Sequence, residues 1–65
     1  MYSISYTYEG ATYEAEYDFL DDDNIVVYLP DGRKETWLRG LDPRQAAMRH
    51  LQIYAHAQHK KQDQG

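Results

Sequence analysis

Cysteine is absent from the 65-residue sequence, which also holds only two prolines and four glycines. Without cysteine, neither a disulfide nor a thiolate metal site can stabilise the fold. No apolar run reaches the roughly 18 residues of a membrane-spanning helix, and no basic segment precedes an apolar one as in a secretory signal. We therefore expect a soluble, mature, cytoplasmic protein. The length allows one domain, with a thin core because short chains bury only about 60% of their surface.

Lysine and arginine are absent from residues 1–32, which hold eight acidic side chains. Residues 33–65 hold seven basic side chains against three acidic ones, so the two halves carry opposite charge although the net charge is −4. We interpret this asymmetry mainly as attraction between the two halves of one fold. The functional alternative is an acidic surface offered to a basic partner.

Two stretches near the N-terminus, 2–8 and 11–19, alternate large apolar side chains with hydroxyl and carboxylate side chains. This period of two is typical of half-buried strands, so the pair predicts a hairpin. A two-residue turn would pair Tyr8 with Ala11, and a four-residue loop would pair Tyr8 with Tyr13. Both keep the apolar side chains on one face. We favour the two-residue turn, with the tyrosine face as the core.

A second hairpin is predicted around Pro30-Asp31-Gly32, whose composition favours a type I turn with a bulge at the glycine. The run 25–29 is apolar and β-branched, as in central strands, and 33–38 forms the fourth strand. A three-residue loop places Trp37 opposite Ile25. We expect the core to include Ile25, Val27, Leu29 and Trp37. The opposite face would then expose an apolar patch made of Val26, Tyr28 and Leu38.

The C-terminal third predicts one helix, from Pro43 to about Lys60. Asp42 suits the N-cap position, Pro43 suits the first helical position, and Gln45 completes a capping box. The inward stripe is Ala47, Met48, Leu51, Tyr54 and Ala55, with Ala46 and Ile53 on its shoulders. The fold class is α+β: a four-stranded antiparallel meander (ββββ) with one C-terminal α-helix packed on one face. The single domain covers 1–61, followed by a frayed tail, 62–65.

No constellation of residues predicts catalysis, so we expect no enzyme and no cofactor. The Asp21–Asp23 loop lacks the alternating ligands of a calcium loop. His56, His59 and Asp63 have a spacing that suits zinc or nickel on one helix face, but they lie at a fraying helix end. We therefore predict no physiological metal site.

For the function, we predict a small non-enzymatic protein-interaction domain, a regulator or inhibitor that docks on a larger protein. The predicted partner-binding residues combine an acidic row with the outer apolar patch: Glu14, Glu16, Asp18, Asp22, Val26 and Tyr28. One alternative is a nucleic-acid-binding module that uses Arg44, Arg49, Lys60 and Lys61, although the acidic side chains would repel phosphates. Another alternative is a homodimeric structural domain, paired through edge strands or through the outer patch. We expect no membrane partner.

Overall fold

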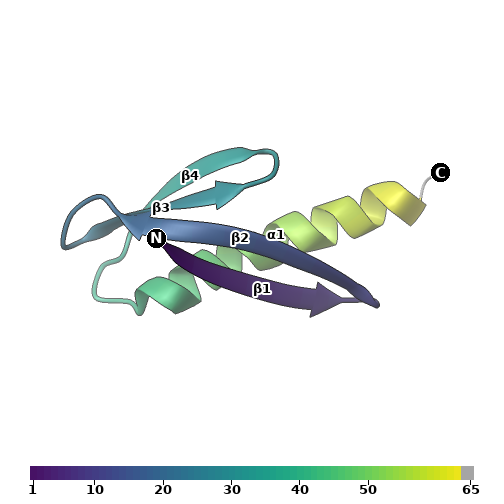
Figure 1. The fold of residues 1–65 in the computed structure, drawn as a ribbon, viewed down its shortest axis with the longest axis horizontal. Helices are drawn as coiled ribbons and strands as arrows, with labels where there is room; N and C mark the ends of the chain where they lie inside the picture. The colour runs from purple at the N-terminus through teal and green to yellow at the C-terminus, as the bar shows by residue number, and fades with distance from the viewer. Residues whose placement is uncertain (64–65) are drawn as a thin grey trace.

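The chain folds as one antiparallel sheet with one helix. A computed structural model describes the backbone of residues 1–63 and the side chains through Lys60. Its elements are β1 (Tyr2–Tyr8), β2 (Ala11–Phe19), β3 (Asn24–Leu29), β4 (Gly32–Trp37) and α1 (Pro43–Asp63). The sheet order is β1-β2-β3-β4, and α1 crosses one face of the sheet (Figure 1). The predicted α+β fold is therefore confirmed.

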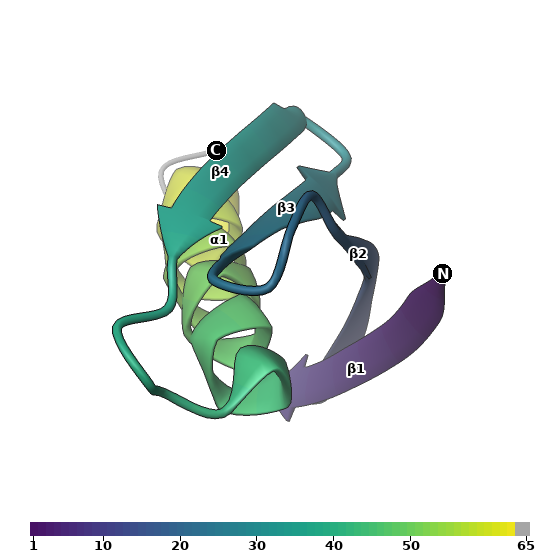
Figure 2. The same cartoon turned by 90° about the vertical axis from the view of Figure 1, so that its left-hand side faces the viewer.

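The sheet curves around the helix. In the view along the molecule, the strands form an arc with α1 on its inner side (Figure 2). The helix packs mainly on β1 and less closely on β2 and β3. This arrangement leaves the outer face of the sheet without a covering element in the described part of the chain.

The first hairpin has the two-residue turn that the sequence favours. Tyr8 pairs with Ala11, and the register continues to Tyr2 opposite Tyr17. Glu9 and Gly10 both have positive φ angles, 52° and 81°. A type I′ turn requires positive φ at both central positions, and its twist matches that of the flanking strands. The predicted register of β1 and β2 is confirmed.

The predicted register of the second hairpin is wrong by one residue. Leu29 pairs with Gly32, and Ile25 pairs with Thr36, so Pro30 and Asp31 form a two-residue loop without the predicted bulge. Trp37 consequently lies opposite Asn24. Because side chains alternate between faces along a strand, this shift reverses the face of every residue in β4.

The hydrophobic core lies between α1 and the inner face of the sheet, and it corrects the predicted positions of two neighbouring residues. Leu38 is only 4% exposed, whereas Trp37 is 60% exposed. The Leu38 amide donates to the carbonyl oxygen of Asp23 at 2.7 Å, which holds the chain after β4 over the core. The buried cluster consists of Ile4, Ala15, Tyr17, Ile25, Val27, Leu38, Ala46, Ala47 and Leu51.

The predicted open apolar patch does not form. Val26 is on the outer face, between Asp18 of β2 and Glu35 of β4, yet it is only 2% exposed. Leu38 is in the core. Tyr28 alone of the three predicted patch residues is exposed.

The helix begins as predicted and extends further. The Arg44 amide donates to Asp42 Oδ1 at 2.8 Å, which confirms Asp42 as the N-cap. Of the two predicted shoulder residues, Ala46 is buried but Ile53 is 60% exposed, so the prediction for Ile53 is wrong. The helix continues to Asp63, so the predicted tail, 62–65, begins inside it. Residues 64–65 lie outside the described residues.

Candidate functional site

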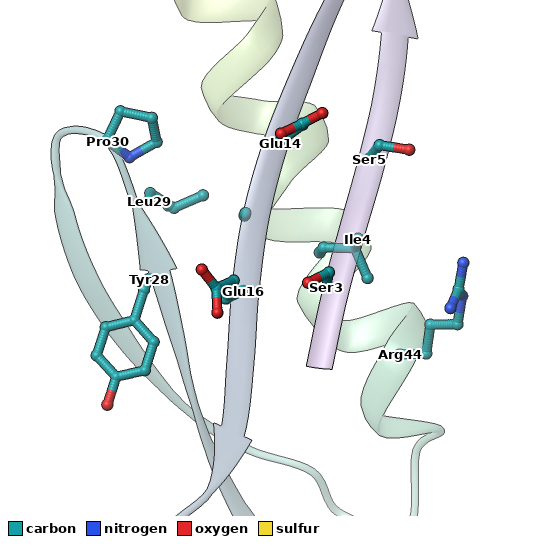
Figure 3. A pocket seen from close by; sticks show the side chains of 10 residues that line it. Ser3, Ile4, Ser5, Glu14, Glu16, Tyr28, Leu29, Pro30 and Arg44 are labelled. Carbon is teal, nitrogen blue, oxygen red and sulfur yellow. The ribbon is translucent and has the colours of Figure 1, made fainter. Parts of the chain in front are cut away.

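The outer face of the sheet carries a hollow of about 620 Å³, formed where β3 separates from β2. The paired part of β2 and β3 runs from Phe19 opposite Ile25 to Glu16 opposite Tyr28. Beyond it β2 continues toward Ala11, while β3 ends at Leu29 and turns. The hollow is lined by Ser3, Ile4, Ser5, Glu14, Ala15, Glu16, Tyr28, Leu29, Pro30 and Arg44 (Figure 3).

Two carboxylates stand on β2 within this hollow. Glu14 and Glu16 are exposed and lie on the same face of the strand, so their Cα atoms are about 7 Å apart. Neither forms an ion pair among the side chains that the structure describes. The ion pair within that part of the chain is on β4, outside the hollow, where Arg33 lies 3.9 Å from Glu35. Both carboxylates are therefore available to a ligand.

Three elements surround these carboxylates. Ser3 and Ser5 of β1 lie on one side, and Tyr28 and Pro30 at the end of β3 lie on the other (Figure 3). Arg44, in the first turn of α1, lies beyond β1. The hollow thus combines two carboxylates, hydroxyl groups and an aromatic ring with one guanidinium group, that of Arg44. Because the carboxylates outnumber the guanidinium, the hollow suits a polar or cationic ligand more than an apolar one.

The structure brings together three of the six predicted partner-binding residues. Glu14, Glu16 and Tyr28 line the hollow, whereas Asp18, Asp22 and Val26 do not. Asp18 is half-buried, and its Oδ1 accepts a hydrogen bond from the Phe19 amide at 2.9 Å. Asp22 is exposed in the loop between β2 and β3.

That loop is organised by Asp21 rather than by Asp22. The Asn24 side-chain amide and the Asp23 backbone amide both donate to Asp21 Oδ1, at 3.0 and 2.8 Å. These hydrogen bonds, led by that from Asn24, lower the pKa of Asp21 because they stabilise the charged carboxylate. The Asp21 carboxylate therefore serves to hold the turn together through its hydrogen bonds to Asp23 and Asn24.

Trp37 is an exposed outer-face residue that the sequence interpretation placed in the core. The carbon of the Arg39 guanidinium group lies 4.7 Å from the centre of its ring. The pairing of Trp37 with Asn24 puts it on the same face as Tyr28. The sequence signal for this position is the Pro30-Asp31 pair: a two-residue loop there, in place of the predicted bulged turn, puts Trp37 on the outer face.

Of the described residues of the nucleic-acid alternative, Arg44 lies on a different face of α1 from Arg49 and Lys60. Successive helical residues are about 100° apart, so Arg49 lies about 140° around α1 from Arg44, and Lys60 lies close to the direction of Arg49. Arg44 and Lys60 are also separated by about 24 Å along the helix axis. The Lys61 side chain lies outside the described residues.

The histidines of α1 contact neighbouring side chains of the sheet. His56 Nε2 is 3.1 Å from the Tyr6 hydroxyl, and the rings of His56 and His59 both lie against Tyr8. Among the side chains that the structure describes, no group of three possible ligands is placed to hold a metal ion. Asp63, the third member of the predicted metal spacing, has its side chain outside that set.

His50 connects β4 to the helix. Its Nε2 is hydrogen-bonded to the hydroxyl of Thr36 on the inner face of β4. Burial lowers the pKa of His50, and the nearby charges of Lys34 and Arg49 lower it further. His50 borders a second, smaller hollow of about 170 Å³, with Lys34, Ile53 and Tyr54 among its other lining residues.

Comparisons of the chain with protein-family models, curated proteins and solved structures found no match. Within the described residues, no helix is both long enough and apolar enough to cross a membrane.

Proposed function

We propose that the chain is a small, non-enzymatic protein-binding domain whose outer-face hollow receives a basic segment of a larger protein. One observation carries the proposal: Glu14, Glu16 and Tyr28 line a single hollow on a sheet face that no other described element covers. The two carboxylates are exposed and unpaired within the described chain, so a partner's lysine or arginine can reach them.

Aromatic side chains support the same kind of ligand. Tyr28 borders the hollow and is 39% exposed, so its ring can lie against a cationic side chain. Trp37, on the same face, already has Arg39 over its ring, which demonstrates that geometry within the molecule itself. Tyrosine, tryptophan and arginine are also the residue types that dominate binding energy at protein interfaces.

The charges contribute mainly to association rate and specificity. An exposed ion pair stabilises a complex by about 0–1 kcal/mol, so two carboxylates alone do not give tight binding. They do attract a basic partner over roughly 8 Å at physiological salt, and they disfavour acidic competitors. A regulator or inhibitor that docks reversibly on a larger protein is consistent with this balance.

The test is capture of a partner from native lysate by the immobilised chain, followed by measurement of its affinity with purified components. The double substitution E14K/E16K reverses the charge of the hollow, and we expect it to abolish capture. The matched control E9K/D31K makes the same change in net charge at two exposed turn positions outside the hollow, and it should retain the partner.

Two outcomes would contradict the proposal. Equal loss of binding in both double variants would indicate a response to overall charge, and retention in E14K/E16K would place the interface elsewhere. A salt-dependent mobility shift with RNA or DNA, abolished by R49E/K60E, would instead support the nucleic-acid alternative.

A further inference from the structure

The two edges of the sheet differ in composition. β4 forms one edge and carries Arg33, Lys34 and Glu35 in succession. β1 forms the other edge, and its sequence, Tyr-Ser-Ile-Ser-Tyr-Thr-Tyr, contains no charged residue, proline or glycine. Exposed edges are usually protected from pairing with another chain by charges, proline or bulges. The β4 edge has such protection and the β1 edge lacks it.

The backbone groups on the open side of β1 can be identified from the hairpin. The β-turn joins Tyr8 to Ala11 as a hydrogen-bonded pair, and such pairs alternate along an antiparallel ladder. The N–H and C=O groups of Ser3, Ser5 and Thr7 are therefore directed away from β2, toward the open edge. All three residues are exposed.

The sequence of β1 is nearly symmetric about Ser5. If two copies pair in antiparallel fashion with Ser5 opposite Ser5, then Ser3 lies opposite Thr7, Ile4 opposite Tyr6, and Tyr2 opposite Tyr8. Hydroxyl side chains thus face hydroxyl side chains, and apolar side chains face apolar ones. In this register the outward-directed groups of Ser3, Ser5 and Thr7 are also the ones that exchange hydrogen bonds.

We propose that the chain forms a two-fold symmetric homodimer in which the β1 strands of two copies pair antiparallel about Ser5, giving one continuous eight-stranded sheet. A two-fold axis at the centre of a nearly palindromic strand satisfies the self-complementarity that such an interface requires. In Figure 3, Arg44 lies to the side of β1, beyond this edge. This dimer does not depend on the proposed function of the hollow.

Disulfide trapping tests both the pairing and its register. The native chain has no cysteine, so each introduced cysteine is unique. Opposite residues of a hydrogen-bonded pair have Cα atoms about 5.5 Å apart, within disulfide reach, so S5C should form a covalent dimer on mild oxidation. Two Ser3 residues would be about 13 Å apart, so S3C alone should not cross-link. An equimolar mixture of S3C and T7C should cross-link to each other.

Self-association of the unmodified chain gives a second readout. Sedimentation equilibrium should show a dimer, and S5K should abolish it at the same concentration because two like charges meet on the axis. S5E alone should also be monomeric, whereas an equimolar mixture with S5K should restore a dimer. A native chain that stays monomeric at millimolar concentration would overturn the proposal, as would S3C cross-linking to itself as efficiently as S5C does.

Discussion

Replacing Leu38 and Trp37 with alanine, one at a time, tests the register of β4 directly. Leu38 belongs to the core, so L38A leaves a cavity there and should lower the free energy of unfolding by about 2–5 kcal/mol. Trp37 is exposed on the outer face. W37A removes its contact with Arg39, which is worth about 0.5–1 kcal/mol at an exposed site. The loss of the larger side chain should therefore have the smaller effect.

Thermal and urea unfolding followed by circular dichroism would measure the difference. In a domain of this size, 1 kcal/mol shifts the melting temperature by roughly 4–8 °C. W37A should therefore lower the melting temperature by at most about 8 °C, and L38A by at least about 8 °C. The free energy of unfolding of a domain of this size is on the order of 3–10 kcal/mol. The loss expected for L38A is a large part of that value, so this variant can be too unfolded for an accurate measurement. L38M, which nearly preserves side-chain volume, should then lose less than about 1.5 kcal/mol.

The reasoning fails if W37A is as destabilising as L38A or more so. That result would support the three-residue loop, in which Trp37 faces the helix and Leu38 faces solvent. I53A is a useful reference, because Ile53 is a large apolar residue of α1 that is exposed. The I53A substitution should change the free energy of unfolding by no more than about 0.5 kcal/mol.

Three further predictions concern a histidine, a buried hydroxyl group and a turn. The pKa of His50 is lowered in the folded chain, so below its ordinary value of 6.5 the unfolded chain binds more protons. The free energy of unfolding should consequently fall as the pH is lowered from 7.5 to 5.5, and H50Q should remove this part of the fall. Among the described side chains the Tyr13 hydroxyl is buried without a hydrogen-bond partner, so Y13F should leave the urea midpoint unchanged or raise it. Glu9 has a φ of 52°, so E9N should raise the melting temperature by several degrees because asparagine adopts this conformation more readily.

Each of these predictions has a contradicting result. An identical pH dependence in H50Q would show that His50 does not contribute in this range. A loss of more than about 1 kcal/mol in Y13F would mean that the hydroxyl group makes a stabilising interaction. G10A is the control for the turn: it places a side chain at a φ of 81°, so it should destabilise the hairpin that E9N stabilises.

The fold was predictable because local signals agreed with one another. Alternation over 2–8 and 11–19 fixed both strands, and only registers that keep one face apolar were compatible with it. The second hairpin gave a weaker signal. β4 is mostly polar, and Trp37 and Leu38 are adjacent, so either register places one of them on each face. A tertiary interaction, the hydrogen bond from Leu38 to Asp23, accompanies the arrangement in which Leu38 enters the core.

The composition of the hollow was partly predictable, but its shape was not. Alternation already placed Glu14 and Glu16 opposite the tyrosine face. The hollow itself depends on the twist of the sheet and on the point where β3 leaves β2, neither of which follows from local sequence. Val26 shows that strand position alone does not predict the exposure of a side chain. Its position in the strand is on the outer face, yet its neighbours bury it, and burial depends on the side chains of adjacent strands.

The hollow and the β1 edge use different atoms of the same residues. Ser3 and Ser5 line the hollow from the outer face, while their backbone groups point sideways from β1. A ligand in the hollow therefore leaves the hydrogen-bonding groups of the edge free. In the paired dimer, two β1 strands separate the two copies of β2, so the two rows of carboxylates lie about 14 Å apart on one continuous face. That spacing allows one basic segment of a partner to contact both copies, so pairing of β1 would strengthen binding at the hollow through avidity.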